Sequence, residues 1–194
     1  MSVRPLELIA ELRSEPATAA VLSRLARRPC IDSHNESVAV IAVDIARELG
    51  ADDLRHVARA GLLHDVGKQL VAREILDKPG ALTAGEWAIV RRHAEHGHRI
   101  LVAAGLPREA LIALHHHERW DGTGYPHGLA GEAIPLVARI LAVADTYDAM
   151  TSARPYRAPL AHDRAVAELA RVSGSQLDPA CVAAFAAAPL SVAA

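Results

Sequence analysis

Histidine and aspartate side chains are spaced along this sequence in a way that could build a metal site. The chain of 194 residues holds 11 histidines, and several stand near the ends of segments with helical spacing. Carboxylates and imidazoles on facing helices commonly form metal sites in helical bundles. The candidate ligands are His34, His64, Asp65, His93, His116, His117 and Asp145. Taken singly, each could equally be an ordinary polar pair or a satisfied core or surface residue, because motif matches carry false positives.

Asp145 is the most informative member of this set. It follows Ile140, Leu141 and Val143 on a segment that is apolar almost all round, which is typical of a buried helix. A buried carboxylate must be paired or bound to metal. We therefore expect Asp145 to lie inside the bundle.

The elements that must position these side chains are helices. Aromatic residues make up only 3% of the chain, so Ala, Leu, Val and Ile must fill the core, which favours helices over a β-sandwich. Gly50 and Gly105 suit helix ends, and Thr83 with Glu86 has the spacing of a capping box. We predict an all-α, single-domain helical bundle. Its helices are expected over 16–28, 34–49, 53–64, 84–101, 107–117 and 135–150, with a last one beginning at 179.

The domain organisation is predicted from the same patterns. We expect an N-terminal helical segment over 1–28, the main domain over 29–188 and a short tail over 189–194. The amphipathic N-terminal segment could pack on the domain or pair two copies in a homodimer. The interval 118–134 is rich in glycine and cannot be a helix, and a loop of this length inside a compact domain is often functional.

Charge and composition exclude several classes of protein. Lys and Arg total 21 against 23 Asp and Glu, whereas a protein that binds DNA or RNA polymers is expected to be far more basic. Two cysteines, Cys30 and Cys181, cannot form a zinc-finger ligand set or a disulfide framework. No apolar run has the length of a signal peptide or a membrane span. We expect a cytoplasmic protein without membrane contact.

Three stretches resemble the HD-GYP family, the HD-type metal-dependent phosphohydrolases with an added Gly-Tyr-Pro loop. They are HDVGK at 64–68, LDKPGALTAGEW at 76–87, and the long run HHERWDGTGYPHGL that begins at His116 and continues to Arg157. The resemblance covers about residues 34–185. It implies an all-helical bacterial phosphodiesterase that acts on cyclic di-GMP and releases linear pGpG, GMP or both.

The resemblance also implies roles for individual residues. The seven candidate ligands above all match the metal ligands of the family. Lys68 matches a lysine that faces a substrate phosphate, and Arg154 and Arg157 match basic residues that hold the dinucleotide. Tyr125 of the Gly-Tyr-Pro loop is expected to line the substrate pocket. The family also suggests that this loop contacts cyclic-dinucleotide synthase domains.

One position departs from the family pattern. Some members carry a glutamate for a third metal where this chain has Cys30, so we expect two divalent metal ions. Two ions about 3.5–4 Å apart can supply both a nucleophile and stabilisation of negative charge. We expect Asp65 to bridge them and a bridging hydroxide to attack phosphorus. His34, His64 and Asp145 would complete the coordination of one ion, and His93, His116 and His117 would complete that of the other.

The sequence leaves open which metal binds and which nucleotide is the substrate. Imidazole and carboxylate ligands without thiolate suit iron, manganese or zinc, and the family implies iron or manganese. An HD-type hydrolase of another nucleotide would have an identical ligand set. A catalytically inactive module that senses or binds a cyclic dinucleotide is the third alternative, although none of the seven ligands is lost.

Overall fold

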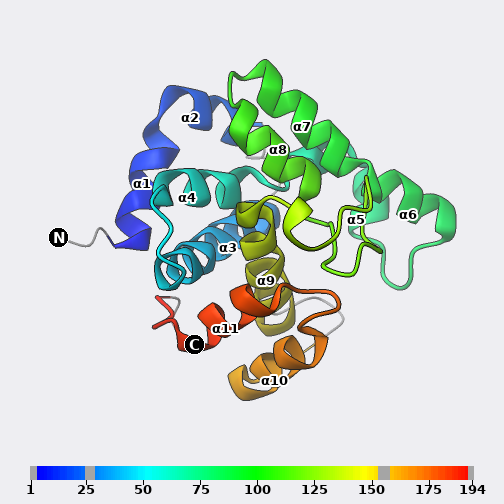
Figure 1. Ribbon diagram of the computed structural model, residues 1–194. Coiled ribbons are helices and arrows are strands. Elements are labelled where there is room, and N and C mark those ends of the chain that lie inside the picture. The colour runs from blue at the N-terminus through cyan, green and yellow to red at the C-terminus, as the bar shows by residue number, and fades with distance from the viewer. Residues whose placement is uncertain (1–3, 25–28, 153–157, 192–194) are drawn as a thin grey trace.

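Helices account for the regular structure in the computed structural model, which describes residues 4–24, 29–152 and 158–191 (Figure 1). The described residues form no strand, and their one isolated β-bridge joins Ser173 and Leu177. The predicted all-α class is therefore confirmed. The α-helices are α1 (Pro5–Ser14), α2 (Pro16–Leu22), α3 (Pro29–Glu48), α4 (Leu54–Leu63), α5 (Arg73–Leu76), α6 (Ala84–Arg91), α7 (His93–Ala103), α8 (Pro107–His115), α9 (Leu136–Thr151), α10 (His162–Val172) and α11 (Pro179–Ala187). Short 3-10 helices cover Val66–Leu70 (η1) and Gly131–Ala133 (η2).

The hydrophobic core is organised around α3 and α9. Helix α3 packs against α1, α4, α9 and α11, and the face predicted from Val38, Ile41 and Ile45 is fully buried. On α9, Ile140 and Leu141 are also fully buried. Figure 1 shows α9 beside α3 and α4, with α7 and α8 as an antiparallel pair beyond them. This packing brings the first half of α3, the end of α4, the start of α7, the end of α8 and the second half of α9 towards one region.

Several predicted helix boundaries are confirmed by their capping geometry. Gly50 and Gly105 follow helix ends with φ of 70° and 75°, in the left-handed region that glycine adopts at no steric cost. The backbone N–H of Glu86 donates to Thr83 Oγ1, and the Thr83 N–H donates to the Glu86 carboxylate at 2.7 Å. Asp178 accepts a hydrogen bond from the Ala180 N–H at 2.8 Å, which caps α11.

Other predicted boundaries were wrong. The single helix expected to run from 84 to 101 is broken at Arg92, whose N–H bonds back to Ile89 and Val90 in a tight turn. The helix expected over 16–28 ends at Leu22, where Ser23 Oγ donates to the Ala20 carbonyl. Proline suits the first helical position, so the next helix begins at 29 rather than 34. Helix α8 ends at His115, two residues earlier than predicted, and α10 was not predicted at all.

The N-terminal helix α1 packs on the rest of the molecule. Leu8, Ile9 and Leu12 are buried where α1 contacts α3 and α4. Arg59 on α4 donates to Glu15 just beyond α1 at 2.5 Å. Helix α1 therefore packs on the domain, which is one of the two arrangements expected for the N-terminal segment.

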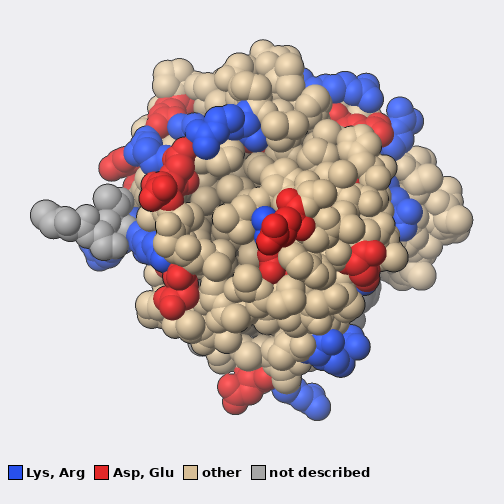
Figure 2. Space-filling model, viewed as in Figure 1, with Lys and Arg blue, Asp and Glu red and all other residues tan. Residues whose placement is uncertain are grey.

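The surface carries charges of both signs. On the face drawn in Figure 2, basic and acidic side chains are interspersed, in agreement with the near-neutral composition. Within the described residues, no helix is both long enough and apolar enough to cross a membrane.

Candidate metal centre

The pair His64–Asp65 lies at the turn where α4 passes into η1. Asp53 caps the start of α4 by accepting from the His56 N–H, and His64 follows the last residue of the helix. Both His64 and Asp65 are 1% exposed. Gly67 in η1 packs so tightly on α7 that a Cβ there would lie 1.9 Å from the His93 carbonyl oxygen. This close approach brings His93 against Asp65.

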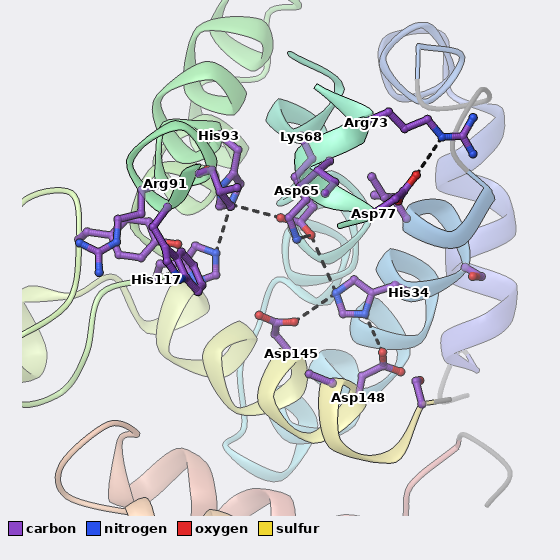
Figure 3. Close-up of a pocket in the computed structure, with 18 of the residues that line it drawn as sticks. His34, Asp65, Lys68, Arg73, Asp77, Arg91, His93, His117, Asp145 and Asp148 are labelled. Carbon is purple, nitrogen blue, oxygen red and sulfur yellow. Dashed lines mark hydrogen bonds and ion pairs between the residues drawn. The ribbon is translucent and has the colours of Figure 1, made fainter. Parts of the chain in front are cut away.

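The Asp65 carboxylate lies between His93 and His34 (Figure 3), and four imidazoles in two groups lie within 4.0 Å of its oxygens. Its Oδ1 is 3.3 Å from His93 Nε2 and 3.8 Å from His116 Nε2. Its Oδ2 is 3.6 Å from His64 Nε2 and 4.0 Å from His34 Nε2. One carboxylate therefore presents a different oxygen to each group.

The remaining predicted ligands complete the two groups. His117 Nε2 lies 3.1 Å from His93 Nε2, beside Oδ1 of Asp65. Asp145 Oδ1 lies 3.1 Å from His34 Nε2, the nitrogen that also faces Oδ2 of Asp65. All seven predicted ligands meet in one place. Asp145 is 26% exposed rather than fully buried as expected, because it lines a cavity.

Backbone hydrogen bonds orient three of these rings. The Nδ1 atoms of His64, His93 and His116 lie 2.7, 2.6 and 2.9 Å from the carbonyl oxygens of residues 61, 90 and 113, each three positions earlier. A carbonyl only accepts, so each Nδ1 carries a proton, and in its neutral form each ring turns an Nε2 lone pair inward. This second contact is the usual way in which a metal-binding histidine is held.

The Nε2 lone pairs that converge between these rings have no N–H group to accept from. His93 Nε2 is 3.3 Å from His116 Nε2, and in the orientation just described neither atom is a donor. His64 Nε2 and Asp65 Oδ1 are buried and have no hydrogen-bond partner. Leaving buried polar atoms unpaired costs free energy, and a cation between them would satisfy them. The residues therefore fit a divalent metal.

The pKa values of His116 and His117 in one group are lowered, whereas that of His34 in the other group is raised. Burial and the adjacent His93 imidazole lower the pKa of His117 to about 3, and burial and the adjacent His117 hold the pKa of His116 well below its usual range. Burial alone would lower the pKa of His34, yet hydrogen bonds to Asp145 and Asp148 raise it to about 9.

Burial would also raise the pKa of Asp65, but Lys68 and the neighbouring histidines hold it well below its ordinary value. The Lys68 ammonium pairs with Asp65 Oδ2. The aspartate is therefore a carboxylate at neutral pH, the form that binds a cation.

Asp148 is a site residue that the sequence analysis missed. Its Oδ2 lies 2.6 Å from His34 Nδ1 (Figure 3), and the side chain is 8% exposed. It stands three residues after Asp145, so one face of α9 carries both carboxylates. That i, i+3 spacing was the signal that could have revealed it.

A cavity of about 1280 Å³ opens from these residues. Its wall includes Lys68, Trp87, Arg91 and Tyr125, and Trp87 is 48% exposed. The Tyr125 ring stacks on His117 with centroids 4.9 Å apart, while the Arg91 guanidinium lies 5.1 Å from the Tyr125 centroid. The prediction that Tyr125 lines the pocket agrees with this position.

Two further predictions depend on side chains that the structure does not describe. Arg154 and Arg157 lie outside the described residues. The side chain of Cys30, on which the prediction of two rather than three metals depends, is also outside them.

Comparison with known proteins places this chain in a family. A family model described as HD domain matches residues 20–181. The chain belongs to the HD domain family. Its similarity to proteins named as cyclic di-GMP phosphodiesterases, at 43–45% identity over 76–78% of the chain, confirms the predicted HD-GYP relationship.

Two curated relatives and one solved structure illustrate the similarity of this HD domain. The cyclic di-GMP phosphodiesterase response regulator RpfG of Xanthomonas campestris is 45% identical over 152 residues, 76% of this chain and 40% of that protein. The 3'3'-cGAMP-specific phosphodiesterase 3 of Vibrio cholerae is 42% identical over 163 residues, 82% of this chain and 35% of its own length. The chain thus spans well under half the length of both relatives.

The solved structure is that of Bd1817, an HD-GYP-type protein from Bdellovibrio bacteriovorus. It superimposes with a TM-score of 0.68 over 92% of this chain and 59% of that one. At 18% sequence identity, this likeness shows the shared fold of the HD domain.

Proposed function

We propose that this chain is a metal-dependent phosphodiesterase that hydrolyses cyclic di-GMP to linear pGpG, GMP or both. The observation that carries the proposal is the Asp65 carboxylate, which presents Oδ1 to one group of imidazoles and Oδ2 to another. Relatives that are 43–45% identical are named as cyclic di-GMP phosphodiesterases.

The ligand assignment follows the two groups. His34, His64 and Asp145 would hold one divalent ion, His93, His116 and His117 the other, and Asp65 would contact both. The donor set contains nitrogen and oxygen only, which suits iron or manganese and also accommodates zinc. Two such ions, when bound, activate water and neutralise charge that develops on the phosphoryl group.

Other side chains would bind and orient the substrate. Lys68 lines the cavity beside Asp65, where its ammonium can neutralise a non-bridging phosphate oxygen. Trp87 and Tyr125 expose aromatic rings to the same cavity, and nucleobases stack on such rings. Arg154 and Arg157 are proposed to hold the dinucleotide, as the family resemblance implies.

The test is anaerobic incubation of the full chain with cyclic di-GMP after loading with iron or manganese. Chromatography should resolve pGpG, GMP or both, and removal of metal by a chelator should stop their formation. Absence of product with iron, manganese and zinc alike would refute the proposal and favour the inactive sensor, which equilibrium binding of cyclic di-GMP would then detect.

A second substrate is supported by one comparison. A relative at 42% identity is named as specific for 3'3'-cGAMP, and the proposed ligands would serve either cyclic dinucleotide equally. Parallel measurement of kcat/KM on both compounds decides between them. We propose cyclic di-GMP as the better substrate, and a higher kcat/KM on 3'3'-cGAMP would overturn that choice.

Three expectations from the sequence stay predictions. They are the domain boundaries at residues 28 and 188, the homodimer, and the contact of the Gly-Tyr-Pro loop with a cyclic-dinucleotide synthase domain. Size measurement in solution and a pull-down with such a domain would test the last two.

A further inference from the structure

A second cluster of metal-binding side chains lies where α8 meets the Gly-Tyr-Pro loop. One ring nitrogen of His115, one of His127 and a carboxylate oxygen of Glu118 lie within 4.8 Å of one another. None of these residues belongs to the centre described above. His115 ends α8, directly before the two proposed ligands His116 and His117, and His127 comes from the loop.

The separation of the two ring nitrogens suits a zinc-class ion. His115 Nε2 and His127 Nδ1 are 3.1 Å apart. Two nitrogens that each lie 2.0–2.1 Å from a tetrahedral zinc ion are expected to be about 3.3 Å apart. Two imidazoles and one carboxylate also leave a fourth position open for water, as in many zinc sites.

Glu118 is held in place for such a role. It is 4% exposed, and its two oxygens accept hydrogen bonds from the N–H groups of His127 and Leu129 at 2.8 and 3.1 Å. Each carboxylate oxygen has a second lone pair, so these bonds orient the group without using up its capacity. Hydrogen bonds of this kind support metal-binding carboxylates.

We propose that His115, Glu118 and His127 form a separate site for a divalent transition-metal ion of the zinc class. An ion here ties the loop to the end of α8. Because Tyr125 of that loop stacks on His117, occupancy of the site stabilises the wall of the substrate cavity. A direct N–H···N hydrogen bond between the two rings is the competing explanation of the 3.1 Å contact.

Zinc stoichiometry of the metal-free full chain tests the proposal. After dialysis against buffered zinc, elemental analysis should find one ion more in the wild type than in His127→Gln. His127 is exposed, so this variant is expected to fold, and thermal melting checks that it does. His162→Gln is the matched control, because His162 is also an exposed histidine but contacts Tyr147 instead. It should bind as many ions as the wild type.

Two more measurements separate this site from the centre around Asp65. Asp65→Asn should lose ions at that centre and still bind the one ion that depends on His127. Zinc should also slow hydrogen exchange of the amides over 122–129 in the wild type and leave it unchanged in His127→Gln. Equal zinc counts in the wild type and His127→Gln would overturn the proposal, as would an equal loss in His162→Gln, which would indicate non-specific binding to surface histidines.

Discussion

His34 Nδ1 and Asp148 Oδ2 lie 2.6 Å apart, and the same ring presents Nε2 to Asp145 at 3.1 Å. The buried Asp148 therefore fixes the orientation of the ring and favours a proton on Nδ1, which leaves Nε2 for a metal. A carboxylate behind a metal-binding histidine also makes the ring more basic. Asp148 thus acts as a positioning residue for His34.

Replacing Asp148 should weaken metal binding without removing a ligand. We expect Asp148→Ala to lower metal affinity about 10- to 100-fold, the usual effect of losing such a partner, and Asp148→Asn to be milder because its amide oxygen still accepts. Metal titration against a fluorescent chelator measures the affinity. Asp52→Ala, an exposed aspartate, is the control, and an Asp148→Ala variant with wild-type affinity would contradict the role.

Metal binding should release a proton. Burial opposes charge on His34, yet its carboxylate partners raise its pKa to about 9, so the metal-free ring is protonated at pH 7.5. A metal ligand must be a neutral imidazole, so that proton must leave, whereas His117, with a pKa of about 3, has none to lose. The apparent affinity should therefore rise with pH up to about 9 and then level off.

Calorimetry of metal binding in buffers with different ionisation enthalpies counts these protons. We expect about one proton from His34 at pH 7.5 and a value that falls towards zero above pH 9. Absence of proton release at pH 7.5 would show that His34 is already neutral in the metal-free protein.

Gly67→Ala should disrupt the centre through the backbone. The new Cβ would lie 1.9 Å from the His93 carbonyl and 2.6 Å from the Gly97 nitrogen, so η1 and α7 must move apart and His93 must leave Asp65. We expect a lower melting temperature together with loss of metal. The matched control is Gly85→Ala in α6, where the Cβ meets nothing within 4 Å and alanine should stabilise by about 0.4–1 kcal/mol. Wild-type metal content in Gly67→Ala would refute this account of the close approach.

Asp65→Ala tests the proposed centre most directly. Since the Asp65 carboxylate faces both imidazole groups, its loss should reduce metal content and kcat/KM by more than the roughly 100-fold seen for outer partners. Elemental analysis and chromatographic assay on cyclic di-GMP give the two readouts. Full activity in this variant would disprove the proposed mechanism, and circular dichroism establishes that the variant is folded.

Local features of the sequence were sufficient for much of the fold. The capping box at Thr83, the left-handed glycines 50 and 105, and the aspartate cap at 178 act within a few residues, so their consequences can be predicted from spacing alone. The break at Arg92 could not, because the apolar pattern continues through it. Beside the break, η1 packs against α7, a contact between segments more than 20 residues apart in sequence that spacing does not reveal.

The sequence by itself determined the all-α class and the family resemblance, and it supplied the seven candidate ligands, which are Asp65 and the six residues around it. Tertiary structure decided which oxygen of Asp65 faces which group, that Asp148 holds His34, and that His115 turns towards His127 rather than joining its neighbours. The physical reason is that helix formation and capping depend on neighbouring residues, whereas the direction in which each side chain points depends on how α3, α4, α7, α8 and α9 pack together.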